Sequence, residues 1–227
     1  MKKFFTEAFE NMGAEERESF YRTVFMNDTS KYAQEKRNEY YRRVLRGMGD
    51  GVEIGVGVKI VNPELITLGD NVKICDGATL IARPETEIFI GNNTVINDRV
   101  YLDTEHKGGY IRIENDVYIG TGTTLFGHMG LEIGDHVLMA QNITLTPYSH
   151  KFGDPDVNII KQGGHSKRVS IGRDAYIGMG VCIMYSGDIG EGSVIAAGAV
   201  VVKPIPPYSV AVGCPAKVIK KREKQEN

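Results

Sequence analysis

The chain has 227 residues and a formal net charge of −2, so it is long enough for one large or two small domains and carries no basic field that would favour nucleic acid as a partner. Its 41% hydrophobic and 25% charged residues are typical of a soluble globular protein, and its apolar runs are too short to span a membrane. Its cysteines, Cys75, Cys182 and Cys214, form an odd and widely spaced set, which indicates free thiols in a reducing compartment. We therefore expect a cytoplasmic protein without a signal peptide, a transmembrane segment or a disulfide framework.

Residues 1–50 predict a helical segment ahead of the rest of the chain. They are rich in charged and aromatic residues, and their apolar residues recur at helical spacing. The residues that carry this spacing are Phe5, Phe9, Met12, Tyr21, Val24, Phe25, Tyr40, Tyr41, Val44 and Leu45. We expect two or three short helices whose apolar stripe is a packing surface and not a ligand site.

From residue 51 onward an aliphatic residue recurs at every sixth position. Eighteen such anchors, in six runs of three, are all apolar. They are Leu68, Ile74, Leu80, Ile90, Ile96, Leu102, Ile113, Ile119, Leu125, Ile133, Met139, Leu145, Ile171, Ile177, Ile183, Ile189, Ile195 and Val201. A six-residue repeat of this kind predicts a parallel β-helix, in which three hexads form one triangular coil and stacked coils are separated by the normal strand spacing of about 4.8 Å.

Insertions follow the third hexad of a coil. The coils begin at residues 68, 90, 113, 133, 171 and 189, which leaves insertions of 4, 5, 2 and 20 residues before the unbroken last step. All insertions are therefore expected along one edge of the prism, where the loops of a solenoid commonly form a binding face. The largest predicts a protruding loop at residues 146–168.

Three parts are expected along the chain. Residues 1–50 form a helical cap over the open end of the β-helix, where unpaired strand edges would invite aggregation. Residues 51–212 form the β-helix with its protruding loop, and residues 213–227 form a short C-terminal tail.

Several segments resemble the hexapeptide-repeat acyltransferases. Residues 169–178 read VSIGRDAYIG and residues 189–203 read IGEGSVIAAGAVVVK, while residues 205–208 (IPPY) and 212–219 (VGCPAKVI) resemble the closing signature of that superfamily. The resemblance covers about residues 51–220 and is nearest to the galactoside and maltose O-acetyltransferases. It implies an all-β fold, a left-handed parallel β-helix with an α-helical N-terminal segment. It also implies a homotrimer that uses acetyl-CoA as co-substrate, with no metal.

His150 is the candidate catalytic base. In the O-acetyltransferases that the chain resembles, the matching loop carries a histidine just after the last strand of the coil, and His150 lies five residues after anchor Leu145. A sugar hydroxyl is a weak nucleophile at neutral pH and needs a base within hydrogen-bond reach as it attacks a thioester. Neutral imidazole fits this role. A carboxylate or a backbone carbonyl should hold the other ring nitrogen, and Asp154 and Asp156 are both candidates.

Four residues are candidate contacts to the substrate that accepts the acetyl group. They are Tyr148, His128, Asp154 and Tyr176. Two of them share the loop of His150, one lies in a smaller insertion on the same edge, and one replaces a tryptophan common in the relatives.

Two positions depart from the pattern of the sugar acetyltransferases. His128 stands where they carry an acidic acceptor contact, and Gly120 stands where they carry an asparagine. Both departures weaken the implication of a galactoside or maltose acceptor, and the identity of the acceptor stays open. His106, one coil before His128, is a weaker candidate for the same pocket, and His165 is expected to be structural or solvent-exposed.

The candidate coenzyme A site consists of corner residues, all but one of them small, and two lysines. They are Gly178, Met179, Ala196, Ala197, Lys203 and Lys217. The resemblance places the pantetheine arm along a prism edge between subunits, where small residues permit close backbone approach. It places the lysines near the phosphates, which they suit as point charges. A backbone amide near Gly178 would then stabilise the thioester oxyanion.

The leading prediction is an acetyltransferase that acts on the hydroxyl of a saccharide or polysaccharide precursor. A second is N-acetylation of an amino group on a nucleotide-linked sugar, which would depend less on His150 because an amine needs less help from a base. A γ-type carbonic anhydrase, which shares this helix and binds zinc through three histidines, is disfavoured because the histidines here include no close pair on one coil. A non-enzymatic scaffold is the remaining alternative.

Overall fold

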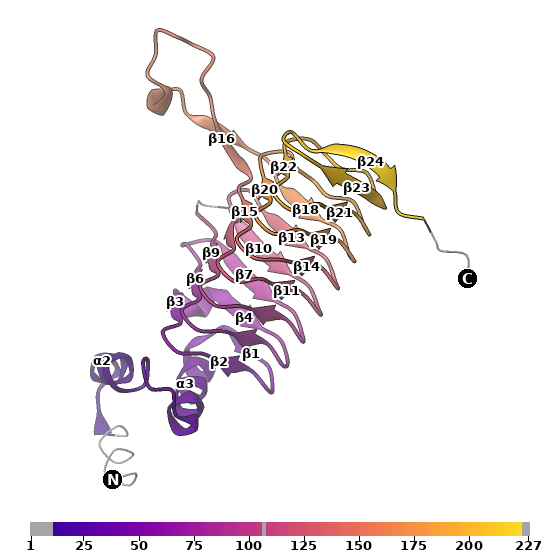
Figure 1. Cartoon of the computed structure of the whole chain (residues 1–227). Coiled ribbons are helices and arrows are strands. Elements are labelled where there is room, and N and C mark those ends of the chain that lie inside the picture. The colour runs from indigo at the N-terminus through magenta and orange to yellow at the C-terminus, as the bar shows by residue number, and fades with distance from the viewer. Residues whose placement is uncertain (1–10, 106–107, 224–227) are drawn as a thin grey trace.

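The computed structural model describes residues 11–105 and 108–223, which form a long triangular prism with helices at one end (Figure 1). A hairpin arm projects from the prism near its other end (Figure 1). Within the described residues, no helix combines the length and the hydropathy that crossing a bilayer requires.

Three sheets form the faces of the prism, and each coil from β1 to β20 contributes one strand to each face, whereas the coil that begins at Ile189 joins sheet A only through an isolated bridge. Sheet A contains β1 (Gly47–Met48), β4 (Ile66–Leu68), β7 (Glu87–Ile90), β10 (Tyr110–Ile113), β13 (Leu131–Ile133) and β18 (Val169–Ile171). Sheet B contains β2 (Glu53–Ile54), β5 (Lys73–Ile74), β8 (Val95–Ile96), β11 (Tyr118–Ile119), β14 (Leu138–Met139), β19 (Tyr176–Ile177), β21 (Val194–Ile195), β23 (Ser209–Val212) and β24 (Lys217–Lys221). Sheet C contains β3 (Lys59–Val61), β6 (Thr79–Ile81), β9 (Tyr101–Asp103), β12 (Thr124–Phe126), β15 (Thr144–Leu145), β20 (Cys182–Ile183) and β22 (Val200–Val201).

The core of the prism is the set of anchors that the six-residue step predicts. All eighteen are at most 2% exposed, so the predicted β-helix is confirmed. Parallel pairing places each anchor directly above its equivalent in the previous coil, as Ile96 lies above Ile74 and Ile119 above Ile96. Each stacked aliphatic side chain is thereby removed from water, which favours the fold by about 1.5–3 kcal/mol per residue.

Polar side chains hold the corners between sheets A and B. The backbone N–H of Asp70 donates to Asn92 Oδ1 at 2.8 Å, and that of Asn92 donates to Asn115 Oδ1 at 2.9 Å. Asn71 and Asn93, the next residues along, adopt the left-handed conformation, with φ near 55°. Asparagine and aspartate tolerate that conformation better than other residues with a side chain, so the sequence of these corners suits their sharp turn.

The insertions all lie on one edge, as predicted. The lengthened connections run from β6 to β7, from β9 to β10, from β12 to β13 and from β15 to β18, each from sheet C to sheet A. We call this edge the C–A edge, and the edge where the chain passes from sheet B to sheet C the B–C edge. The longest insertion contains the hairpin β16 (Tyr148–His150) and β17 (Gly164–Ser166) and the short helix η2 (Ile159–Lys161).

Two described helices, α2 (Ala14–Val24) and α3 (Lys31–Val44), precede the first complete coil. Phe5 and Phe9 lie outside the described residues. Strand β1 pairs with β4 and η1 (Pro63–Leu65) follows β3, so paired strands begin at Gly47, a few residues before the expected boundary at residue 51. At the other end the tail supplies β24, which pairs antiparallel with β23.

Helix α3 covers the backbone of the first coil. Arg37, which is 3% exposed, donates from Nε to the Ile54 carbonyl at 3.0 Å and from Nη1 to the carbonyls of Phe25 and Asp28. Asn38 donates to the Val52 carbonyl at 3.0 Å and accepts from the N–H of Ile54. These bonds satisfy backbone groups that no preceding coil can reach.

Replacing Arg37 by methionine is expected to lower the free energy of unfolding by about 2–4 kcal/mol, because three carbonyls, two of them in buried hydrogen bonds, lose a charged donor. Urea unfolding at neutral pH measures this. The matched control is Arg43→Met on the exposed face of the same helix, which should change stability by less than about 0.5 kcal/mol. Equal effects of the two substitutions would show that α3 does not cap the solenoid through Arg37.

Candidate active site

His150 ends strand β16, at the base of the arm on the C–A edge. Its strand pairs antiparallel with β17, where Ser149 faces His165 in the register. The side chain of His150 is exposed, and a hydrogen bond from the Lys151 N–H to the Gly163 carbonyl (3.0 Å) fixes the strand just beyond it. The hairpin therefore holds the imidazole at a defined place on the edge and leaves it accessible.

Aromatic rings from successive coils form a continuous row that leads to His150. Tyr101 contacts Phe126 edge-on at 6.1 Å between ring centroids, and Phe126 lies 6.1 Å from His128. His128 stacks on Tyr148 at 5.0 Å, and Tyr148 contacts His150 edge-on at 4.9 Å. We call these five residues the aromatic row. It gives the C–A edge an apolar wall, and it brings three of the predicted site residues together.

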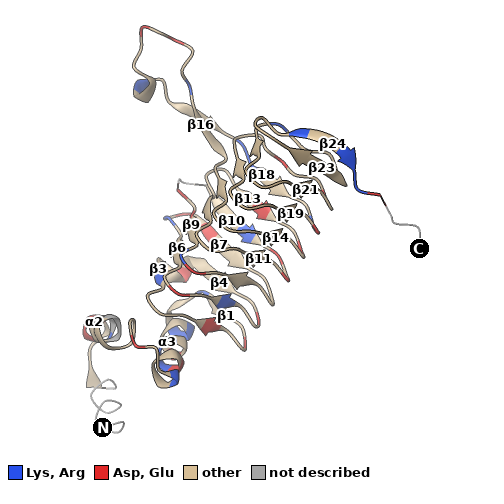
Figure 2. Ribbon diagram, in the orientation of Figure 1, with Lys and Arg blue, Asp and Glu red and all other residues tan. Residues whose placement is uncertain are grey.

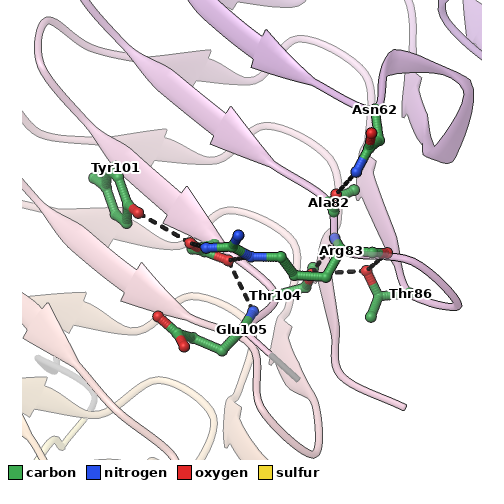
Figure 3. A network of polar contacts seen from close by, with 8 residues as sticks. Asn62, Ala82, Arg83, Thr86, Tyr101, Thr104 and Glu105 are labelled. Carbon is green, nitrogen blue, oxygen red and sulfur yellow. Dashed lines mark hydrogen bonds and ion pairs between the residues drawn. The ribbon is translucent and has the colours of Figure 1, made fainter. Parts of the chain in front are cut away.

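A buried carboxylate lies at the far end of the aromatic row. Asp103 is fully buried and accepts from Arg83 through Nε at 2.9 Å and Nη2 at 2.6 Å. It also accepts from the Tyr101 hydroxyl at 2.9 Å and from the Glu105 N–H at 2.8 Å (Figure 3). The N–H of Arg83 donates to the Thr104 hydroxyl at 2.8 Å, so both partners of the ion pair are fixed (Figure 3).

Burial alone would raise the pKa of Asp103, but hydrogen bonds from Arg83, the Glu105 N–H and Tyr101 hold that pKa below its ordinary value. A carboxyl with a lowered pKa in the folded state stabilises the fold above its unfolded pKa of about 3.9 and loses that contribution as the pH falls. Stability that depends on this network should therefore decline in acid.

Asp103→Asn is expected to lower the free energy of unfolding by about 1–3 kcal/mol at pH 7, because charge-assisted hydrogen bonds are lost. The difference from the wild type should shrink as the pH falls below about 4, because the carboxyl takes up a proton first in the unfolded chain and then, at lower pH, in the folded protein. Urea unfolding across pH 3–7 measures this, with the fully exposed Asp50 as control in Asp50→Asn. A stability difference that is independent of pH would contradict the assignment.

The corner residues predicted to bind coenzyme A lie on a different edge of the same chain from His150. Gly178 directly follows β19 on the B–C edge, where an added Cβ would lie 2.5 Å from the Ala197 nitrogen. Ala197 and Met179 are exposed beside it, and an added Cβ at Gly198 would meet nothing within 4 Å. The coils therefore approach closely at Gly178, and the exposed backbone of this corner is open to an extended ligand.

The two predicted lysines are exposed near the C-terminal end of the prism. Lys203 follows β22 toward the C–A edge, whereas Lys217 begins β24 in sheet B. Figure 2 shows basic residues on β24. Lys221 and Arg222 are tied to the fold: Lys221 donates to the Pro207 carbonyl at 2.9 Å, and Arg222 pairs with Asp174 at 2.8 Å. Within the part of the chain that the structure describes, no ion pair occupies Lys203 or Lys217.

Two predicted acceptor contacts lie away from the aromatic row. Tyr176 is exposed on the outer face of sheet B, next to Gly178. Asp154 is on the arm, where its carboxylate accepts the Asp156 N–H at 3.0 Å and its backbone is bridged by Gln162. Among the described residues, no hydrogen bond or ion pair joins Asp154 or Asp156 to His150, whose ring contacts that of Tyr148.

Sequence reasoning missed Phe126 and the pair Arg83–Asp103. Phe126 and Asp103 each stand one position after a third-hexad anchor, in register with each other on sheet C. The residue after a third-hexad anchor lies just before the insertion of its coil, and it is therefore close to the C–A edge. Inspecting the residue after each third anchor would have found Phe126 and Asp103, but not Arg83, which stands three positions after anchor Leu80. His106 lies outside the described residues, and no group of three or more potential metal ligands occurs among those that are described.

Comparisons with known proteins agree with this architecture. No family model matches the chain. A probable acetyltransferase of Mycobacterium tuberculosis is 36% identical over 166 residues, which cover 73% of this chain and 54% of that protein. Galactoside O-acetyltransferase of Escherichia coli is 35% identical over 133 residues, which cover 58% of this chain and 62% of that protein. The chain thus spans between half and two thirds of the length of these curated relatives.

Among solved structures, AntD, an N-acyltransferase from Bacillus cereus in complex with dTDP and 3-hydroxybutyryl-CoA, has a TM-score of 0.60 at 20% identity. The match covers 87% of this chain and 92% of that chain, and it shows a shared fold. A parallel solenoid built on hexads, with all insertions on one edge, defines the hexapeptide-repeat class. The similarity to named acetyltransferases is more specific, and it agrees with the resemblance of the sequence motifs to the hexapeptide-repeat acyltransferase superfamily.

Proposed function

We propose that the protein is an acyl-CoA-dependent acyltransferase that moves an acetyl group from acetyl-CoA to a sugar hydroxyl, with His150 as general base. The observation that carries the proposal is the exposed imidazole of His150 at the head of the aromatic row. Aromatic rings present flat apolar faces on which a sugar ring can lie, and an exposed imidazole beside them can reach a bound hydroxyl.

In the proposed reaction His150 accepts the proton of the acceptor hydroxyl while the oxygen attacks the thioester carbonyl carbon. A C–O bond forms, the C–S bond breaks, and the proton passes to the departing thiolate. The N–H groups of the B–C corner near Gly178 are the candidate donors to the oxyanion. The thiol-bearing arm would lie along Ala196 and Ala197, with its phosphates near Lys203 and Lys217.

The site is proposed to form between subunits of a homotrimer. His150 stands on the C–A edge, whereas Gly178 and Ala197 stand on the B–C edge of the same prism. One chain therefore keeps the base and the cofactor groove apart, separated by sheet C. In a closed ring of three copies, the C–A edge of each chain meets the B–C edge of its neighbour, which completes three equivalent sites.

N-acylation of an amino group on a nucleotide-linked sugar is the second candidate. AntD, which shares the fold, is an N-acyltransferase in complex with dTDP. An amine acceptor needs less help from a base, so the two activities differ in how strongly they depend on His150.

The test measures thiol release from acetyl-CoA in the presence of neutral sugars and of amino sugars, with and without a nucleotide. The proposal expects release with a hydroxyl acceptor and binding of acetyl-CoA in calorimetry. Release with amines alone would favour the second candidate. Absence of acetyl-CoA binding would remove both candidates and favour a scaffold.

A further inference from the structure

The ion pair between Arg83 and Asp103 has a feature that coil packing does not require. In the register of sheet C, Asp103 lies between Ile81 on the previous coil and Phe126 on the next, so both neighbours at this position are apolar. Ile81 is buried and needs no polar partner. The ion pair is also weak evidence for stabilisation, because removing the Asp103 carboxylate from water offsets much of its attraction to Arg83. The pair therefore calls for a role beyond packing.

Asp103 fixes the guanidinium of Arg83 while leaving part of it accessible. The Asp103 carboxylate accepts hydrogen bonds from Nε and Nη2 of Arg83. The side chain of Arg83 is 43% exposed, whereas that of Asp103 is fully buried. Within residues 11–105 and 108–223, Nη1 of Arg83 donates no hydrogen bond. A planar guanidinium held in this way presents its remaining N–H donors in a fixed direction.

The pair lies on the same edge as the proposed base, at the opposite end of the aromatic row. Tyr101 links the ion pair to the aromatic row, because its hydroxyl donates to Asp103 at 2.9 Å and its ring contacts Phe126. From β9 to β15 the edge rises by two coils, or about 10 Å at the normal strand spacing. This is longer than one sugar ring, so a monosaccharide whose hydroxyl meets His150 would not reach Arg83.

We infer that Arg83, held by Asp103, forms a second acceptor subsite that binds an uncharged sugar unit of a saccharide longer than one ring. The inference rests on the proposed function and names its substrate class. Arg83 donates hydrogen bonds to hydroxyl or ring oxygens of this unit, and the aromatic row supports the saccharide between the subsite and His150. Arg83 is thus a specificity-determining residue and takes no part in proton transfer.

The charges around Arg83 favour a neutral unit over an anion. Asp103 neutralises the guanidinium in direct contact, and the Glu105 carboxylate adds a further negative charge that acts on Arg83. A phosphate or carboxylate placed at the subsite would face this excess of negative charge. The subsite therefore disfavours a nucleotide-linked acceptor, because the diphosphate of that acceptor would have to lie along the same edge.

The experiment compares matched saccharides that differ in length: glucose, maltose and maltotriose; galactose and lactose; N-acetylglucosamine and its β-1,4-linked dimer. Thiol release gives kcat and KM, and saturation-transfer NMR gives binding without turnover. In at least one series, the wild type is expected to show a KM for the longer saccharide that is lower by about tenfold or more than its KM for the monosaccharide. One charge-assisted hydrogen bond from Arg83 would have an effect of this size. Arg83→Gln should abolish this preference without changing kcat or the KM for the monosaccharide.

Two further variants make the outcome decisive. Arg83→Lys keeps a charge beside the buried Asp103 but removes the planar fork, so it should fold and still lose the preference. Arg112→Gln is the matched control, because Arg112 is 45% exposed and lies 3.5 Å from Glu114 on sheet A, and it should behave as the wild type.

The inference is overturned if no series shows a preference for length, if the preference survives both substitutions of Arg83, or if Arg83 instead selects a phosphorylated or carboxylated sugar. Normal acetyl-CoA binding in these variants separates such a result from failure of the proposed function, in which acetyl-CoA itself would not bind.

Discussion

His150→Ala is expected to lower kcat for acetyl transfer to a sugar hydroxyl by about 10²–10⁴-fold, the usual contribution of a positioned general base. The substitution removes the exposed imidazole at the head of the aromatic row and leaves the solenoid intact. The unfolding midpoint and the affinity for acetyl-CoA should therefore stay at wild-type values. Steady-state thiol release and calorimetry measure the three quantities.

The matched control is His165→Ala, which removes an exposed histidine one strand away in the same hairpin. His165 faces Ser149 in the register and its ring packs on Tyr185 at 4.6 Å, on the side away from the aromatic row contacts. Its loss should change kcat by less than about threefold, because it has no part in proton transfer. Similar losses in the two variants would mean that the arm acts through its fold and that His150 is not the base.

Ala197→Trp is expected to weaken acetyl-CoA binding by about a hundredfold, equivalent to about 2.7 kcal/mol. Ala197 is exposed on the B–C edge, directly above Gly178, so an indole can occupy the proposed groove without entering the core. Calorimetry with acetyl-CoA measures the loss, and thermal unfolding should show an unchanged midpoint.

Ala197→Ser provides the control for this position because serine keeps the small size of the corner. It should bind acetyl-CoA within about threefold of the wild type, since the backbone approach remains open. If the tryptophan variant also binds normally, the cofactor does not lie along the B–C edge, and the assignments of Met179, Ala196 and Lys217 fail with it.

The six-residue spacing of the apolar anchors predicts the β-helix, because buried positions recur along the chain with the same spacing. Every third-hexad anchor, such as Leu102 or Leu125, is buried, and the breaks in the step place all insertions on the C–A edge. The position of His150 follows from that count, since the arm begins where the step from Leu145 is interrupted. Periodicity alone therefore locates the proposed base on its edge.

Contacts across coils and within the arm could not be predicted in the same way. Arg83 and Asp103 meet because one coil separates them, and a lone aspartate after an anchor resembles a solvated turn in the sequence. The arm has no repeat, so nothing in its sequence shows that the Asp154 carboxylate accepts the Asp156 N–H. The capping bonds of Arg37 depend on the direction in which α3 crosses the first coil.

The most direct test of a site shared between chains is complementation between two inactive variants. His150→Ala and Ala197→Trp are unfolded together, refolded as an equal mixture and assayed for thiol release against each variant refolded alone. If each site takes its base from one chain and its groove from the next, random assembly restores about one quarter of the wild-type activity. A mixture that shows no more activity than the two separate variants would contradict the account, because base and groove would then belong to one chain.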